Sequence, residues 1–474
     1  MRILFVASEA FPLVKVGGLA DVTSSLAIAL QDLGHEPYLI LPKYGSMKAP
    51  VQAAREPNVA ITFAGHSEQV ALKTTMLKGK IPVYLVENDD YFGTDEIYSR
   101  DELRRFLFFS LSIPDIISRL DLRPDVVHCH DWHTALTPLW LRKAGAKLPC
   151  IFTIHNLAYQ GPFDGRFLRN SRLSSIWQEY IPLGAPTAGL NFMSRGILLA
   201  DIVTTVSPSY ASEILTPQHG EGLDKLLNFR RNELYGIANG IDYDEYDPAG
   251  DPYLEANYDS LTIEKRVDNK LALQRKSGLP QNSDIPLFGM VSRLDEQKGI
   301  DLLLQAIDPF MAETRAQLVI LGEGREHYHE LLTGAAQKFP DRLSVFIAHD
   351  EGLARLIYGG SDMFLMPSRF EPCGLGQLIA MRYGAIPVVR HTGGLADTVE
   401  DVAQEDGNGF VFQDYAVPEM LEAIGRAEKS FYQREEWQDL MRRNMKLDFS
   451  WKASARKYEE IYLRAQSIFQ ARRS

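Results

Sequence analysis

Short runs of apolar residues recur along the chain, and each is followed by polar or glycine-rich residues and then by a helical pattern. Such runs occupy residues 3–7, 38–41, 83–87, 125–128, 151–154, 202–206, 287–291, 318–321, 343–347, 363–366 and 386–389. Continuous apolar strands that alternate with helices are typical of parallel sheets covered on both faces. The pattern therefore predicts the α/β class, with doubly wound sheets.

The predicted strands fall into two groups separated by a polar stretch. Residues 244–284 contain the run DPAGDP and predict a linker region. We therefore expect two Rossmann-like domains, at 1–243 and 285–450, facing a deep cleft. Residues 451–474 alternate apolar and charged positions at helical spacing and predict a C-terminal helix. Ligands of such sheets bind beyond the carboxyl ends of the strands, which is where the motifs below lie.

Composition narrows the class of protein without choosing a function. The chain has 474 residues, 45% hydrophobic and 24% charged, as expected for a globular protein with more than one core. Its net charge of −12 argues against nucleic acid as a partner, which usually needs a basic face. The start, MRILFV, indicates a strand rather than a signal peptide, and no stretch reaches the roughly 18 apolar residues of a membrane span. Three cysteines do not make a disulfide framework, so we expect a cytoplasmic protein without a membrane partner.

The first candidate motif is KVGGLADV at residues 15–22, which follows the first predicted strand and opens a helix. Paired glycines let backbone N–H groups approach an anion, while the helix N-terminus and Lys15 add positive charge. A plain strand-to-helix turn explains the same residues, and the G-x-G-x-x-G dinucleotide spacing is absent. The motif is thus compatible with a phosphate site without requiring one.

Histidines follow two further strands of the first group. The segment HCHDWH at residues 128–133 has metal-ligand residue types, but neighbours on a strand point to opposite faces. No second Cys/His pair follows at zinc spacing, so we expect no metal and interpret the segment as a strand end carrying polar groups to a ligand. His155, directly after the strand at 151–154, could bond a sugar hydroxyl or stabilise developing charge, or it could be structural.

The second group of strands ends in cations, a carboxylate and another glycine pair. Arg293 ends a strand and Lys298 lies five residues on, beside a predicted helix start, which suits a diphosphate clamp. Glu371, within PSRFEPCGLG at residues 367–376, is placed for ligand hydroxyls. Gly374 and the TGGLAD segment at 392–397 offer further backbone N–H groups, although tight turns explain them as well. Together the motifs suggest a phosphorylated ligand gripped by both halves of the chain.

In their order along the chain, the motifs at 15–21, 155–157, 293–299, 368–375 and 392–395 resemble those of bacterial glycogen synthases and plant starch synthases. The resemblance covers nearly the whole chain. It implies a GT-B fold and a retaining glucosyltransferase that moves glucose from ADP-glucose to the non-reducing end of an α-1,4-glucan, without a cofactor. It implies the catalytic residues Glu371, His155, Arg293 and Lys298. It implies the substrate-binding residues Lys15, Gly17, Gly18, Asp21, Asp131, Asn156, His349, Cys373, Gly374, Leu375, Thr392 and Gly393.

The resemblance also implies roles for these residues. Arg293 and Lys298 would clamp the diphosphate and stabilise the negative charge that develops as the sugar–phosphate bond breaks. His155 would touch the donor glucose, and Asp131 would face the acceptor. Glu371 would either position the sugar or attack it as a nucleophile, and the sequence leaves both open. Closure of the domains over the donor would exclude water.

Two positions depart from the pattern of the family. His349 stands where members often carry an aromatic residue at the nucleotide base, so the choice between adenine and uracil stays open. Gly376 stands where a larger residue is common. The alternatives are another GT-B glycosyltransferase that uses UDP-glucose or a different acceptor, and a glucan-binding protein without turnover. The missing dinucleotide fingerprint argues against a nicotinamide dehydrogenase.

Overall fold

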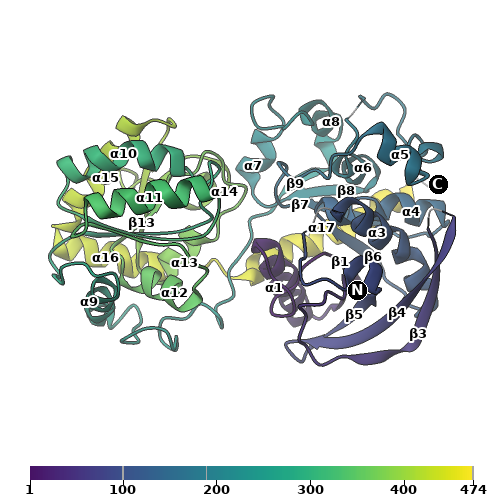
Figure 1. Cartoon of the computed structure of the whole chain (residues 1–474), viewed down its shortest axis with the longest axis horizontal. Helices are drawn as coiled ribbons and strands as arrows, with labels where there is room; N and C mark the ends of the chain where they lie inside the picture. The colour runs from purple at the N-terminus through teal and green to yellow at the C-terminus, as the bar shows by residue number, and fades with distance from the viewer. Residues whose placement is uncertain (64, 99–100, 188, 472–474) are drawn as a thin grey trace. The chain divides into compact units, whose positions relative to one another are not determined.

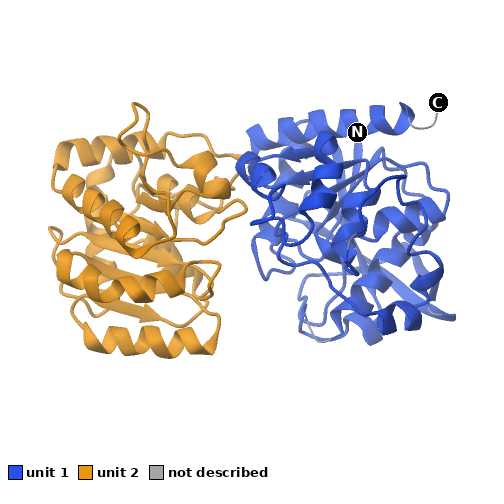
Figure 2. Ribbon diagram, turned by 90° about the horizontal axis from the view of Figure 1, so that it is seen from above, with its two compact units in different colours: residues 1–239, 451–474 blue, residues 240–450 orange. Residues whose placement is uncertain are grey.

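The computed structural model describes residues 1–63, 65–98, 101–187 and 189–471, which form two compact units (Figures 1 and 2). Unit 1 consists of Met1–Asn239 together with Trp451–Ser474, and unit 2 is Gly240–Ser450. Unit 1 is therefore discontinuous in sequence, because its last helix follows unit 2 along the chain. Within the described residues, no helix is both long and apolar enough to cross a membrane.

Unit 1 is built on a sheet with the strand order β3-β4-β5-β2-β1-β6-β7-β8-β9. Its strands are β1 (Arg2–Val6), β2 (Glu36–Pro42), β3 (Gln52–Phe63), β4 (His66–Leu77), β5 (Ile81–Glu87), β6 (Val126–His130), β7 (Cys150–Ile154), β8 (Ile202–Thr205) and β9 (Leu234–Gly236). From β5 to β9 the neighbours are parallel, whereas β3, β4 and β5 pair antiparallel. The order reverses between β1 and β6, as in a Rossmann sheet.

Helices connect and cover these strands. They are α1 (Gly18–Asp32), α2 (Asp89–Phe92), α3 (Glu102–Arg119), η1 (Trp132–Thr134), α4 (Thr137–Lys143), α5 (Gly165–Asn170), η2 (Leu173–Ser175), α6 (Phe192–Leu199), α7 (Pro208–Glu213), α8 (Asp224–Phe229), η3 (Arg231–Glu233) and α17 (Trp451–Ala471). The C-terminal α17 packs beside α1 (Figure 1). Its Tyr462 hydroxyl lies 3.0 Å from Nδ1 of His128 on β6, and Ser454 donates to the Ala238 carbonyl at 2.6 Å. The helix thus completes the core of unit 1.

Unit 2 is a fully parallel sheet with the order β12-β11-β10-β13-β14-β15. Its strands are β10 (Leu287–Val291), β11 (Gln317–Leu321), β12 (Leu343–Phe346), β13 (Met363–Met366), β14 (Ile386–Arg390) and β15 (Phe410–Phe412). Its helices are η4 (Ile263–Lys265), α9 (Arg266–Lys276), α10 (Ile300–Glu313), α11 (Glu326–Lys338), α12 (Glu351–Gly360), α13 (Gly376–Arg382), α14 (Gly393–Thr398), α15 (Val417–Phe431) and α16 (Arg434–Met445). This is the doubly wound dinucleotide-fold order, with the reversal between β10 and β13.

The predicted doubly wound α/β class is confirmed in both units. Strands such as β1 and β11 are apolar after their first residue and buried along nearly their whole length, because helices cover both faces of each sheet. The β3–β4 hairpin is an addition that apolar runs did not predict, since its strands are polar and exposed at many positions. It forms one edge of the unit 1 sheet.

Residues 244–284, expected as a linker, fold as part of unit 2, and the boundary between the units lies at Asn239 and Gly240. Within this stretch α9 packs against α12 and buries Leu273. Arg266 donates to the carbonyls of Tyr383 at 2.8 Å and Tyr358 at 3.0 Å. Polar residues that suggested a linker, such as Arg266, therefore make buried hydrogen bonds within unit 2.

Candidate functional site

Each sheet reverses its strand order at one point, and most of the predicted site residues follow strands at or next to the two reversals. In unit 1 the central strands β1 and β6 end at Val6 and His130, and in unit 2 β10 and β13 end at Val291 and Met366. Ligands in doubly wound sheets bind beyond the carboxyl ends of the strands at such points. The candidate residues form two groups, one on each unit.

An internal carboxylate orders the loop that joins β1 to α1. Glu9 is only 2% exposed, and its Oε2 accepts the backbone N–H groups of Val16 at 2.5 Å and Gly17 at 3.1 Å. The Tyr98 hydroxyl donates to its Oε1. Burial raises the pKa of Glu9, and the hydrogen bonds act against that rise. Glu9 was not predicted from the sequence, where its only signal is an acid soon after the first strand.

Four predicted residues meet at the N-terminus of α1. Gly17 is the N-cap residue and Gly18 begins the helix. Lys15 donates to the Asp21 carboxylate at 2.8 Å in a partly exposed ion pair. The Lys15 ammonium also lies 5.0 Å from the centre of the Phe11 ring. The loop therefore presents a cation, a carboxylate and a helix N-terminus side by side.

Residues after β6 and β7 form a second cluster in unit 1. Asp131 has a φ of 56°, and its Oδ1 accepts the N–H of His155 at 2.8 Å. Burial raises the pKa of Asp131 to about 7, although backbone N–H groups of His155 and Asn156 act against it. His155 Nε2 lies 3.0 Å from His130 Nδ1, and burial lowers the pKa of His155 to about 3, so its ring is neutral at pH 7. Asp131 is thus brought together with His155 and Asn156.

The remaining histidine of β6 serves packing rather than ligand binding. His128 Nε2 lies 2.6 Å from the Thr153 hydroxyl, and its Nδ1 faces Tyr462 of α17. Over the described part of the chain, no three His, Cys, Asp or Glu side chains are grouped to hold a metal ion.

In unit 2, the central feature is an ion pair between two loops. Lys298 Nζ lies 2.8 Å from Oε1 and 2.7 Å from Oε2 of Glu371, and Ser368 donates its hydroxyl to Oε2 at 3.0 Å. The Glu371 side chain is 5% exposed and that of Lys298 is 19% exposed. The pair joins the loop after β10 to the loop after β13. Ser368, which was not predicted as a site residue, fixes the carboxylate from a second side.

Two glycines allow the loops to approach so closely. Gly299 has a φ of 78°, and a Cβ atom there would lie 2.0 Å from the Pro367 carbonyl oxygen. A Cβ at Gly394 would lie 2.0 Å from the Cys373 carbonyl oxygen. The Gly394 N–H also donates to the carbonyl of Glu371 at 2.9 Å. Larger residues would separate the segments that hold the Glu371 carboxylate.

The residues next to Glu371 form the turns before α13 and α14. Gly374 has a φ of 71°, and the Gln377 side chain donates to the carbonyls of Cys373 at 3.1 Å and Gly374 at 2.9 Å. Leu375 is the N-cap residue of α13, and Thr392, which is buried, is that of α14. The predicted residues Cys373, Gly374, Leu375, Thr392 and Gly393 therefore lie around the Glu371 segment.

Arg293 and His349 are the two remaining predicted residues of unit 2. Arg293 is half exposed, lies 3.3 Å from Asp295 and donates to Gln297 at 3.0 Å. His349 is exposed beyond β12, and β11 and β10 separate β12 from the strand that leads to Glu371. Its neighbour Asp350 caps α12.

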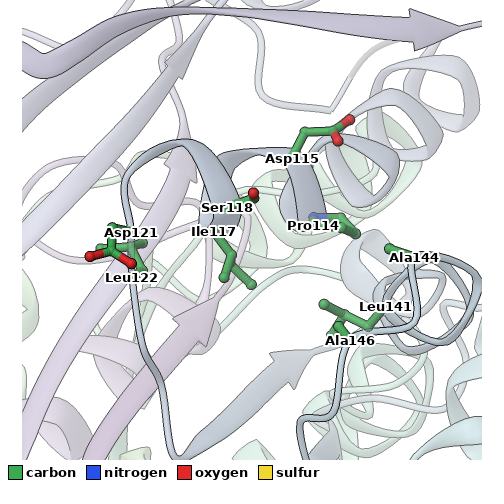
Figure 3. Close-up of a pocket in the computed structure, with 9 residues that line it drawn as sticks. All are labelled: Pro114, Asp115, Ile117, Ser118, Asp121, Leu122, Leu141, Ala144 and Ala146. Atoms are coloured by element: carbon green, nitrogen blue, oxygen red, sulfur yellow. The ribbon is translucent and has the colours of Figure 1, made fainter.

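A pocket of about 400 Å³ lies elsewhere on unit 1 (Figure 3). It is lined by Pro114, Asp115, Ile117, Ser118, Asp121, Leu122, Leu141, Ala144 and Ala146. These residues belong to the C-terminal parts of α3 and α4 and the segments that lead into β6 and β7. The pocket therefore lies toward the amino ends of the strands, at the opposite edge of the sheet from the predicted residues.

Comparisons with known proteins cover almost the entire chain. Residues 2–229 match the family described as Starch synthase catalytic domain, and residues 273–443 match Glycosyl transferases group 1. Glycogen synthase 2 of Geobacter sulfurreducens is 45% identical over 484 residues, and the glycogen synthase of Bacillus subtilis is 40% identical over 472, each with 98% of both chains covered.

Among solved structures, the catalytic domain of starch synthase IV from Arabidopsis thaliana, bound to ADP and acarbose, matches with a TM-score of 0.91 at 35% identity. That match covers 98% of this chain and 99% of the other. Sucrose-phosphate synthase from Thermosynechococcus elongatus matches with a TM-score of 0.64 at 16% identity, with 98% of each chain covered, which shows a common fold.

Proposed function

Because this chain belongs to the glycogen and starch synthase family of GT-B glycosyltransferases, we propose that ADP-glucose is its donor and the non-reducing end of an α-1,4-glucan its acceptor. Glucosyl transfer in glycogen synthesis is the activity of the chain. The identity of the donor, retention at the anomeric carbon and the roles of single residues are the proposed part. The observation that carries the proposal is the ion pair between Lys298 and Glu371 at the strand reversal of unit 2.

Unit 2 binds the donor diphosphate in this proposal. Arg293 and Lys298 lie in the loop that enters α10, whose first N–H groups carry partial positive charge. Breaking the sugar–phosphate bond builds negative charge on the departing diphosphate, which these cations stabilise. Lys298 has three N–H donors, so it can keep Glu371 and still bond a phosphate oxygen. The ADP in the starch synthase IV structure supports the choice of an adenine nucleotide.

Glu371 positions the donor glucose. Both of its carboxylate oxygens already accept hydrogen bonds from the Lys298 ammonium, and one accepts the Ser368 hydroxyl as well. A carboxylate held in this way is a poor nucleophile but can accept further bonds from sugar hydroxyls. We therefore favour attack by the acceptor hydroxyl on the face that the phosphate leaves, with the leaving phosphate accepting the proton.

Unit 1 supplies the acceptor side of the reaction and, through His155, a contact to the donor glucose. His155 is neutral at pH 7, so it acts on the glucose through a hydrogen bond rather than a positive charge. Asp131 and Asn156 flank it, and Lys15 and Asp21 lie at the start of α1. We also propose the cytoplasmic location expected from the sequence. The three cysteines, which are all buried free thiols, support it.

Release of nucleoside diphosphate from ADP-glucose and from UDP-glucose, each with and without glycogen, tests the proposal. We expect glycogen-dependent ADP release and at least about tenfold less UDP release. Equal or faster UDP release would overturn the choice of donor and direct attention to His349. If neither donor gives release that depends on glycogen, the function itself is wrong.

A further inference from the structure

The N–H groups that would make the glycine loop of unit 1 a phosphate site are already occupied. Val16 and Gly17 both donate to Oε2 of Glu9, so this carboxylate takes the place that an external anion would fill. Gly18, the next residue, is exposed at the first position of α1. An anion that approaches the loop therefore meets Gly18 and Lys15 rather than the whole glycine turn.

Glu9 is fixed from three directions, which makes it part of the fold rather than a temporary occupant. Its side chain accepts from the loop and from Tyr98, and its own carbonyl accepts the Thr23 hydroxyl of α1 at 2.7 Å. The residue is 2% exposed. To release the loop, the carboxylate would have to lose its donors while it remains buried, which is costly.

Tyr98 is in turn held by α3. Buried Arg105 donates to the carbonyls of Tyr91 at 2.5 Å, Ile97 at 3.0 Å and Glu96 at 3.1 Å, so it anchors the segment that leads directly to Tyr98. The Tyr98 ring stacks on His133 with centroids 4.9 Å apart and an angle of 24° between the planes. Since His133 follows Asp131 closely in sequence, Tyr98 connects the loop after β1 to the turn after β6.

We infer that Glu9 and Tyr98 are positioning residues that fix the loop at 15–18 against the turn at 131–133, and that Val16 and Gly17 N–H groups do not bind the donor diphosphate. The inference rests on the proposed function. It assigns diphosphate binding mainly to Arg293 and Lys298 of unit 2, and it gives Glu9 the task of keeping Lys15 and Gly18 in a fixed geometry. Loss of that geometry lowers turnover more than it weakens nucleotide binding.

Four variants of the full chain test this inference: Glu9→Ala, Glu9→Gln, Tyr98→Phe and the control Glu179→Ala, at an exposed position of unit 1. For each, kcat and KM are measured for both substrates, Kd for ADP by calorimetry, and Tm by thermal denaturation. We expect Glu9→Ala to lower kcat by about 10- to 100-fold, because a loop displaced by an ångström has effects of that size. Its Kd for ADP should stay within about twofold of wild type.

The conservative variants separate positioning from general damage. A glutamine oxygen can accept the same two N–H groups, so Glu9→Gln should recover kcat to within about fivefold of wild type. Tyr98→Phe, which keeps the ring, should lower kcat by about three- to tenfold. If Glu9→Ala does not fold, the kcat values of Glu9→Gln and Tyr98→Phe test the inference. The control should match wild type.

If the wild-type protein is active, any of three outcomes would overturn the inference. One is a kcat within about twofold of wild type in both Glu9→Ala and Tyr98→Phe. Another is a Kd for ADP at least tenfold lower in Glu9→Ala than in wild type, a gain in binding free energy of about 1.4 kcal/mol. That result would show that Glu9 occupies the phosphate site. The third is a Glu9→Gln variant as impaired as Glu9→Ala. Wild-type protein without glycogen-dependent release would instead refute the proposed function.

Discussion

Lys298 Nζ lies within 2.8 Å of both carboxylate oxygens of Glu371, although the two residues follow different strands of the unit 2 sheet. The pair is largely buried, so each charge depends on the other for compensation. The same two side chains are assigned to the diphosphate and to the sugar. Stability and catalysis can therefore be separated at this position by changing one charge or both.

Lys298→Met should abolish most activity and also destabilise unit 2. The lost cation leaves the Glu371 carboxylate buried without compensation, which costs roughly 3 kcal/mol, and turnover should fall by at least about 100-fold. The double variant Lys298→Met/Glu371→Gln should regain much of the lost Tm but none of the activity. Thermal denaturation and ADP release measure the two effects.

A matched control for that experiment is Lys338→Met. Lys338 donates to both oxygens of Asp308 at 2.7 Å, but both side chains are more than half exposed. Exposed pairs contribute little, so Tm and turnover should stay near wild type. If the double Lys298/Glu371 variant were as unstable as the single one, the pair would not be the source of the instability.

Gly299→Ala should displace Lys298 and lower both stability and turnover. The position has a φ of 78°, and the new Cβ would meet the Pro367 carbonyl oxygen at 2.0 Å. A side chain in this backbone region costs roughly 1–2 kcal/mol before the clash is counted, and turnover should fall at least about tenfold. Gly334→Ala, in the open on α11, is the matched control and should instead gain about 1 kcal/mol. Similar behaviour of both variants would contradict the close approach.

Asp131→Asn should stabilise the protein more at neutral than at acidic pH. Burial raises the pKa of Asp131 to about 7, whereas an unfolded aspartate titrates at about 3.9. Between these values only the folded state holds the proton, so the stability of the wild type falls by up to about 1.4 kcal/mol for each pH unit of increase. Asparagine removes this loss.

The difference in Tm between Asp131→Asn and wild type should thus widen from acid toward neutral pH and level off above the folded pKa. Thermal denaturation across a pH series measures it, with Asp341→Asn at an exposed position as the control. A difference that does not change with pH would show that Asp131 is ionised throughout.

The native protein should resist thiol reagents. Cys129 and Cys150 are buried, burial raises the pKa of Cys129 to about 12 and also raises that of Cys150, and Cys373 is only 6% exposed. Because the thiolate is the reactive form, Ellman's reagent should titrate three thiols only after denaturation. Fast loss of activity in the native state that disappears in Cys373→Ser would contradict the burial of this thiol.

The sequence predicted every central strand, because strands covered on both faces form nearly continuous apolar runs. It did not predict the β3–β4 hairpin, whose pattern is interrupted by a bulge between Ala53 and Asn58 and by exposed polar positions. Its polar composition also predicted a linker at residues 244–284. That prediction failed because residue type alone does not distinguish buried polar side chains, such as Arg266 and Asn269, from solvated ones. Burial of polar groups depends on partners that lie far along the chain.

Only part of the candidate site could be predicted from the sequence, as was true of the fold. Lys15, His155 and Glu371 follow strand ends, and the doubly wound order places strand ends together. Glu9 could not be found in this way, because its role comes from a contact with Tyr98 that lies 89 residues away. Ser368 belonged to a recognised motif, but only the structure shows its hydroxyl on Glu371. Supporting residues are set by tertiary contacts, which no local pattern records.

The return of α17 to unit 1 has a consequence during protein synthesis. The contact between His128 and Tyr462 cannot form until the ribosome has added 334 further residues. The contact between His35 and Glu459 likewise joins residues 424 positions apart. At about 5–20 residues per second, translation of unit 2 alone takes roughly 10 to 40 seconds. Throughout that time the face of the sheet that α17 covers is open on the nascent chain, where chaperones can bind it. Unit 2, which is continuous, can complete its fold first, although it is made second.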